Sequence, residues 1–125
     1  MRRLIYISRS LMDASEIGSL VTVSTERNAR VGITGMLWAS NGCFAQVLEG
    51  DREQIAATMR RIARDPRHAD IEVLLDREVT SRQFGNWSMR SAEDGEATAF
   101  MVGFALTQHT EPAERLREIV LASVL

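Results

Sequence analysis

Cysteine and histidine are both scarce in this sequence, which holds one of the first and two of the second. The single thiol, Cys43, excludes an intramolecular disulfide and any metal site built from several thiolates. The two histidines, His68 and His109, lie far apart and lack the i, i+4 spacing that places two ligands on one helical face, so we expect no metal site. This cysteine usage indicates a reducing, cytoplasmic setting.

Long apolar runs and an excess of charge of one sign are also lacking. No stretch approaches the roughly 20 apolar residues that span a bilayer, and the first residues lack the apolar segment of a signal peptide, so we expect no membrane partner. The chain carries 15 basic and 17 acidic residues, a net charge of −2. That balance removes the usual electrostatic reason to expect a nucleic-acid partner. Phosphate-binding signatures of the G-x-G-x-x-G and G-x-x-x-x-G-K-[ST] types are missing as well.

The pattern of apolar residues alternates between strands and helices within 125 residues, a length typical of one domain. Short β-branched and apolar runs predict five strands, at residues 4–7, 32–40, 43–49, 71–75 and 87–89. The second and third flank Asn41-Gly42, the strongest short hairpin signal. Capping signals and helical spacing predict three helices, from Asp13 to near Asn28, from Asp51 until Pro66, and from Thr110 through Val124.

The order strand, helix, strand, strand, helix, strand is the ferredoxin-like arrangement, here with one strand added. The sequence therefore predicts an α+β fold, with a mixed five-stranded sheet, two helices on one face and C-terminal helices covering the other. The amphipathic segment 111–125 must cover either the second sheet face or another subunit, so we expect a homodimer or higher oligomer.

Several polar residues fall on apolar faces. Strand alternation places Gln46 in a row with Phe44 and Leu48, where it is either a buried amide satisfied by the backbone or an amide whose partners a ligand supplies. Tyr6, the only tyrosine, is on its own more typical of a core residue with a tethered hydroxyl. Asn28 alone is typical of a helix C-cap.

The second predicted helix carries its apolar stripe on Ile55, Met59 and Ile62 and a basic group towards its end. Such a group usually forms a solvated face that complements the helix dipole. Arg60, Arg61 and Arg64 point away from the apolar stripe or lie at its border, so we expect them to be dispensable for chemistry at the face below.

Five stretches carry a resemblance to one known family: RLIYIS (3–8), RNARVGITG (27–35), FAQVLEG (44–50), DPRH (65–68) and RQFGNWSM (82–89). Together, and in this order, they resemble the BLUF domain, a blue-light sensor that uses a flavin, usually FAD. The resemblance implies a flavin-binding core over residues 1–91, with residues 92–125 as a C-terminal helical extension of the same domain.

The resemblance also implies roles for individual residues. Tyr6 gives an electron to the photoexcited flavin, and Gln46 lies between the tyrosine and the flavin, where its amide rearranges by rotation or tautomerisation and strengthens hydrogen bonding to the C4 carbonyl. Asn28 holds the polar edge of the ring, Arg67 reaches the C2 carbonyl, and His68 matches a position near the flavin.

The same resemblance implies a role for two further residues, and helix geometry adds a third. Trp87 and Met89 match residues that pass the signal on. Ser24, one helical turn before Asn28, lies on the same face and can border the ring. Ala45 and Trp38 depart from the residues common in the family, so we expect altered packing of the flavin pocket.

Nothing after residue 91 resembles an output domain. We therefore expect a stand-alone short sensor without enzymatic activity, whose signal goes to a separate effector protein. Two alternatives stay open at this point. One is a small ferredoxin-like hydrolase of the acylphosphatase kind, for which Ser8-Arg9-Ser10 is a poor phosphate loop, and the other is a light-insensitive interaction domain.

Overall fold

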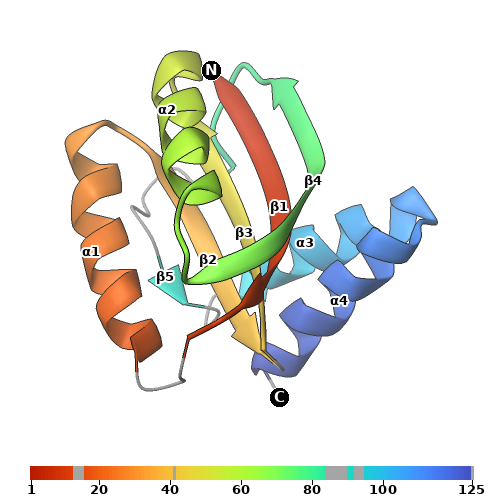
Figure 1. Ribbon diagram of the computed structural model, residues 1–125. Helices are drawn as coiled ribbons and strands as arrows, with labels where there is room; N and C mark the ends of the chain where they lie inside the picture. The colour runs from red at the N-terminus through yellow and green to blue at the C-terminus, as the bar shows by residue number, and fades with distance from the viewer. Residues whose placement is uncertain (13–15, 41, 84–89, 92–94, 125) are drawn as a thin grey trace.

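The computed structural model describes residues 1–12, 16–40, 42–83, 90–91 and 95–124 (Figure 1). Its elements, in chain order, are β1 (Arg2–Ser10), α1 (Ile17–Arg30), β2 (Thr34–Ser40), β3 (Cys43–Gly50), α2 (Arg52–Ala63), β4 (His68–Glu78), β5 (Arg90–Ser91), α3 (Gly95–Gln108) and α4 (Glu111–Val124). The sheet order is β4-β1-β3-β2-β5, with the four long strands antiparallel and the short β5 parallel to β2. The predicted α+β class is confirmed. The strand predicted at 87–89 lies outside the described residues.

Local signals in the sequence explain most of these boundaries. Strands β2 and β3 pair up to Ser40 and Cys43, and Gly42 adopts φ +73° in the turn between them, so the predicted hairpin is confirmed. Asp51 caps α2 by accepting hydrogen bonds from the backbone N–H groups of Glu53 and Gln54. Helix α1 differs from the prediction: its N-cap residue is Glu16, it extends to Arg30, and Asp13 lies outside the described residues.

The sheet separates two apolar cores. On one face, Leu4 and Leu48 of the central strands pack with Ile55 of α2 and with partly buried side chains of α1. On the other face, Ile5 and Val47 pack with the buried side chains of α3 and α4. Figure 1 shows the same layering, with α1 and α2 on one side of the sheet and α3 and α4 on the other. No helix of the described residues is long and apolar enough to cross a membrane.

Of the C-terminal helices expected from the sequence, only one was predicted with bounds, and the structure has two, α3 and α4. Helix α3 was missed because apolar residues surround its whole circumference, so no amphipathic stripe marks it. It packs against α4, and its buried Met101 belongs to the second core. Trp38 and Ala45 also lie in that core, on the face away from Tyr6, so the expectation that they alter the pocket was wrong.

A buried ion pair fixes the end of β3. Glu49 is fully buried, and its carboxylate accepts hydrogen bonds from Arg3 Nε at 2.8 Å and from the backbone N–H of Gln83 at 3.0 Å. Arg82, the residue before Gln83, donates to the backbone oxygens of Glu49 and Gly32. These contacts hold the segment after β4 against the end of the sheet where β2 begins and β3 ends.

Two glycines give matched predictions for this architecture. A Cβ on Gly35 would lie 2.0 Å from the carbonyl oxygen of Val47, whereas a Cβ on Gly103 in α3 would meet nothing within 4 Å. We expect Gly35→Ala to lower the free energy of unfolding by about 3 kcal/mol, since the neighbouring strand would have to move. Gly103→Ala should raise it by about 0.5–1 kcal/mol, since alanine favours helix. Urea unfolding of both variants measures the difference, and equal effects would contradict the close strand approach.

Candidate functional site

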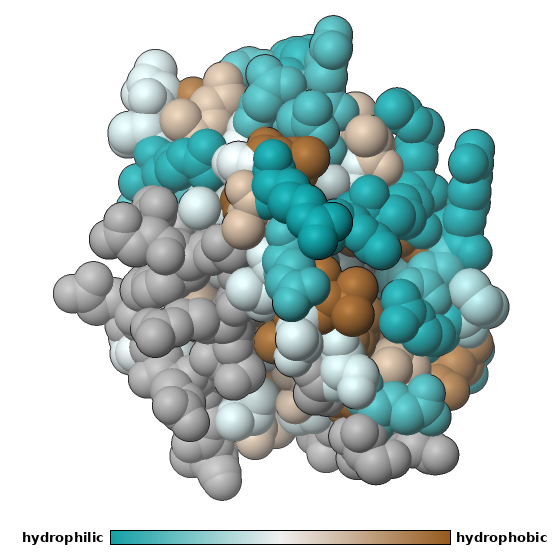
Figure 2. All heavy atoms as spheres, turned by 90° about the vertical axis from the view of Figure 1, so that its left-hand side faces the viewer, coloured by the Kyte–Doolittle hydropathy of each residue, from teal (hydrophilic) through white to brown (hydrophobic). Residues whose placement is uncertain are grey.

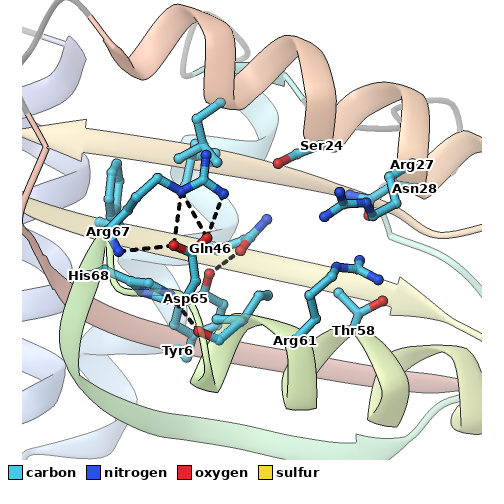
Figure 3. Close-up of a pocket in the computed structure, with 14 residues that line it drawn as sticks. Tyr6, Ser24, Arg27, Asn28, Gln46, Thr58, Arg61, Asp65, Arg67 and His68 are labelled. Carbon is cyan, nitrogen blue, oxygen red and sulfur yellow. Dashed lines mark hydrogen bonds and ion pairs between the residues drawn. The ribbon is translucent and has the colours of Figure 1, made fainter.

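A cavity lies between α1 and α2, over the face of the sheet that carries Tyr6 and Gln46 (Figure 3). Its empty space is about 640 Å³, open solvent at its mouth included. Seen from the α1 side, hydrophobic surface is visible between hydrophilic side chains (Figure 2). The lining combines apolar walls with polar groups, as binding sites for ring compounds do. The apolar members come from four different elements and are Leu20, Leu37, Phe44 and Ile62.

Tyr6 and Gln46 face each other across the β1–β3 pair. They are opposite in the register, and the Tyr6 hydroxyl donates a hydrogen bond to Gln46 Oε1. Both side chains are buried, with exposed fractions of 4% and 5%. Burial, and secondarily the negative charge of Asp65, raises the pKa of Tyr6 well above its ordinary value. Tyr6 is therefore a neutral proton donor to the amide over the whole physiological pH range.

His68 is the first residue of β4 and lies beside this pair. Its Nε2 is 2.8 Å from the backbone oxygen of Ile62, which only accepts, so Nε2 carries a proton. In the neutral ring, Nδ1 then accepts from the hydroxyl of Ser8, 3.0 Å away. The ring centroid is 6.5 Å from that of Tyr6, at a tilt of 48°. His68 thus ties the end of α2 to the strand that carries Tyr6.

Arg67 is held by Asp65 at one end of the cavity. Its Nε and Nη2 donate to the Asp65 carboxylate at distances of 2.5–3.0 Å. These hydrogen bonds hold the pKa of Asp65 below its ordinary value and raise that of Arg67. Since a guanidinium has five N–H donors, the pair leaves Arg67 with donors beyond those that Asp65 uses.

The opposite end of the cavity is formed by Asn28 and Arg27 of α1 and by Thr58 and Arg61 of α2 (Figure 3). Asn28 is 2% exposed, although it lies in the last turn of a helix. Arg60, Arg61 and Arg64 share the basic end of α2, but only Arg61, at the border of the apolar stripe, lines this cavity. Arg27, Thr58 and Asp65 were not singled out, because no pattern within one helix shows which residues of two helices meet.

The residues present fit a flavin ring by the chemistry of their donors and acceptors. The amides of Asn28 and Gln46 offer both donors and acceptors, and Arg67 offers donors only, which suits a ring edge with two carbonyls and an N–H between them. The apolar side chains of the cavity suit the two faces of a flat aromatic ring. Asn28 and Gln46 are buried, so their polar groups act in surroundings that water reaches poorly.

Comparison with known families matches residues 1–90 to BLUF, sensors of blue light using FAD. The chain belongs to the BLUF family. Among curated relatives, photoactivated adenylate cyclase subunit alpha of Euglena gracilis is 34% identical over 96 residues, which cover 74% of this chain and 9% of the relative. The blue light- and temperature-regulated antirepressor BluF of Escherichia coli strain K12 is 36% identical over 59% of this chain and 18% of its own length. The chain thus spans only a small part of these relatives.

Solved BLUF structures have the same fold. The dark-state structure of BlrB, a BLUF protein, aligns with a TM-score of 0.73 at 31% identity, covering 99% of this chain and 96% of BlrB. A bacterial light-regulated adenylyl cyclase aligns with a TM-score of 0.71 at 34% identity, covering 94% of this chain and 36% of the cyclase. The predicted membership of the BLUF family is confirmed, and FAD is the cofactor by which that family is defined.

Six of the eight site residues predicted from the sequence line this one cavity: Tyr6, Ser24, Asn28, Gln46, Arg67 and His68. The other two, Trp87 and Met89, lie outside the described residues. The roles assigned to all eight remain predictions.

The pKa of Tyr6 gives a prediction that ultraviolet titration can test, because the tyrosinate band reports on this one tyrosine alone. We expect no tyrosinate in the folded protein as the pH passes about 10, where the denatured chain ionises. Since the unfolded chain then loses its proton first, the free energy of unfolding should fall above about pH 10 and keep its full value below. Tyr6→Phe should lack this component. Tyrosinate formation near pH 10 in the folded protein would contradict the burial of Tyr6.

Proposed function

We propose that this chain senses blue light with FAD bound non-covalently in the cavity between α1 and α2, catalyses no reaction itself, and signals to a separate effector protein. One observation carries the proposal: the buried hydrogen bond from the Tyr6 hydroxyl to Gln46 Oε1 at the floor of that cavity. It joins a redox-active phenol to an amide that can offer either a donor or an acceptor. Leucine or glutamate at position 46 could not make that exchange.

A flavin bound in the cavity would supply the absorption of blue light and an electron acceptor for Tyr6. Tyr6 releases its phenolic proton to Gln46 Oε1, because that oxygen is the acceptor of its hydrogen bond. Gln46 takes up this proton on Oε1 and gives up one from Nε2, or its amide rotates, so that a donor stands where Oε1 was the acceptor. A flavin bound beside Gln46 would hold the electron from Tyr6 and the proton given up, and the return of both to Tyr6 would restore the phenol and leave the Gln46 group rearranged. The rearranged group then donates more strongly to its carbonyl partner.

The other lining residues hold the ring in this proposal. Asn28 pairs with the polar edge, and Arg67, oriented by Asp65, donates to a carbonyl. Ser24, one turn before Asn28, borders the ring. His68 fixes Ser8 and the end of α2 behind Tyr6.

The architecture, domain bounds and surroundings form part of the same proposal. We assign residues 1–91 to the flavin-binding core of a ferredoxin-like fold and 92–125 to its C-terminal helical extension, with Trp87 and Met89 relaying the signal. The apolar stripe of α4 covers the second sheet face. Because that stripe packs on the sheet, it gives no reason to expect a second subunit. The proposed homodimer or higher oligomer rests instead on the exposed side chains of Leu106 and Leu121, which are 54% and 39% exposed. A cytoplasmic location rests on the single cysteine.

The hydrolase and the light-insensitive interaction domain are less favoured. Ser8, Arg9 and Ser10 belong to the continuous strand β1, and Ser8 is 4% exposed and bonded to His68. A phosphate loop needs exposed backbone N–H groups, whereas those of a central strand are hydrogen-bonded to the neighbouring strands. A light-insensitive domain gives no reason for a phenol and an amide to meet at the floor of a cavity.

Gln46→Leu and Tyr6→Phe test the photochemistry directly. Both variants should stay yellow, because leucine and phenylalanine preserve apolar packing around the ring. Neither should show the light-induced red shift, since one lacks the exchangeable amide and the other the phenolic proton. Dark-minus-light absorbance spectra, with infrared readout of the C4 carbonyl stretch, measure this.

The control is Gln54→Leu, which removes an exposed amide of α2 that is not part of the cavity. It should convert like the parent protein. A persistent carbonyl downshift in Gln46→Leu would remove Gln46 from the mechanism, and a normal red shift in Tyr6→Phe would remove Tyr6.

Asn28→Ala and Arg67→Ala address binding. Each removes hydrogen bonds to the flavin edge, worth about 0.5–1.5 kcal/mol, so we expect affinity for FAD to fall by about three- to tenfold in each. Arg77→Ala, an exposed arginine of β4 outside the cavity, is the matched control and should bind like the parent. Flavin titration decides the point, and unchanged affinity in both cavity variants would mean that the ring is held elsewhere.

A further inference from the structure

Two arginines from different helices meet at one end of the flavin cavity. Arg27 is in the last turns of α1 and Arg61 in the last turn of α2, and Figure 3 shows them on opposite sides of the cavity. Both also line a second, wider hollow of about 1030 Å³, open solvent included, whose lining adds Arg60 and Arg64. Arg27 and Arg61 therefore stand where the ring cavity opens into a basic surface.

This end of the cavity holds positive charge that the described residues do not neutralise. The lining of the wider hollow contains five arginines and one acidic residue, Asp65, and that carboxylate is paired with Arg67. Arg27 and Arg61 make no ion pair within 4.0 Å with a carboxylate of the described part of the chain. The whole chain is net negative, so this excess is local.

The two guanidinium groups also disfavour each other. Burial first, and then the charge of Arg27, lowers the pKa of Arg61. The helix dipole favours cations at the C-terminal ends of both α1 and α2. It favours them equally at Arg30 of α1, which lines neither hollow. The dipole therefore does not explain why Arg27 and Arg61 converge on the opening. An anion between them would turn the repulsion into two charge-assisted contacts, for which the planar fork of arginine suits phosphate.

We propose that Arg27 and Arg61 bind the phosphate of the flavin side chain, so that the chain selects phosphorylated flavins over riboflavin. The inference rests on the proposed function, because it needs the ring in the first cavity. The side chain of the flavin then leaves through the opening that the two hollows share. FMN and FAD both carry a phosphate there, and riboflavin carries a hydroxyl.

Riboflavin and FMN are the sharpest probes, because they differ by the phosphate alone. Protein loaded with one or the other by exchange is diluted, and the rise of free-flavin fluorescence gives the release rate. The parent protein should release riboflavin at least tenfold faster than FMN. In the double variant Arg27→Gln with Arg61→Gln, this ratio should fall to about two or less. FAD release, followed by absorbance after rapid filtration, should accelerate with FMN release.

The matched control is Arg30→Gln with Arg77→Gln, which removes two positive charges from exposed arginines outside both hollows. It should keep the parental ratio. Added salt should speed FMN release from the parent and leave the Arg27/Arg61 variant nearly unaffected, because screening acts on the charge pair.

The ratio of the two release rates separates this inference from the proposed function. A parent ratio near one, or a ratio that the Arg27/Arg61 variant leaves unchanged, would overturn the phosphate site while flavin binding and the red shift stood. A fall of the ratio in the control variant as large as in the Arg27/Arg61 variant would overturn it as well, since general charge would then explain the selectivity. A parent that takes up neither flavin would overturn the proposed function and this inference together.

Discussion

The register between β1 and β3 is the constraint on which the candidate site depends. It sets Tyr6 opposite Gln46 on the face beneath α1 and α2. Because side chains alternate along a strand, a slip by one residue would place the two polar groups on opposite faces of the sheet, one of them in the core under α3 and α4. The hairpin turn at Gly42 sets β2 against β3, and Gly35 allows the backbones of these strands to approach closely. The hydrogen bond between the two groups then offsets a burial cost of about 1–3 kcal/mol.

The residue pattern predicted those parts of the site that depend on strand periodicity or on a local cap. Period-two alternation placed Gln46 correctly beside Phe44 and Leu48, and the Asp51 capping signal predicted the start of α2. The family resemblance added four residues that line the cavity, Tyr6, Asn28, Arg67 and His68. The residue pattern could not predict contacts that depend on how two helices are rotated about their axes. Arg61 lies at the border of an apolar stripe, where a small rotation decides between cavity and solvent. Helix α3 was not predicted for a different reason: a helix that is apolar on all sides has no periodic pattern of apolar residues.

Charge is unevenly distributed over the cavity and its opening. The Asp65–Arg67 pair, which lines both the cavity and the wider hollow, is internally neutral. Arg27 and Arg61 leave a net positive charge at the opening. A negative group is therefore favoured at the opening, whereas the buried amides of Asn28 and Gln46 favour a neutral, hydrogen-bonding ring edge inside the cavity. This order matches a flavin nucleotide, which is neutral at its ring and anionic at its side chain.

Contacts on the opposite face of β3 hold the backbone that carries Gln46, the residue proposed to rearrange. Three residues after Gln46, Glu49 turns its carboxylate to the other side of the sheet and binds Arg3, whose guanidinium lies over the ring of Phe100 at 5.4 Å. Breaking such a buried pair costs about 3–5 kcal/mol, so the backbone of β3 is held firmly from the side away from the cavity. The terminal torsion of a glutamine is broad and roughly two-fold, so it is much softer. In the proposed mechanism, the amide of Gln46 therefore rearranges more easily than the strand that carries it moves.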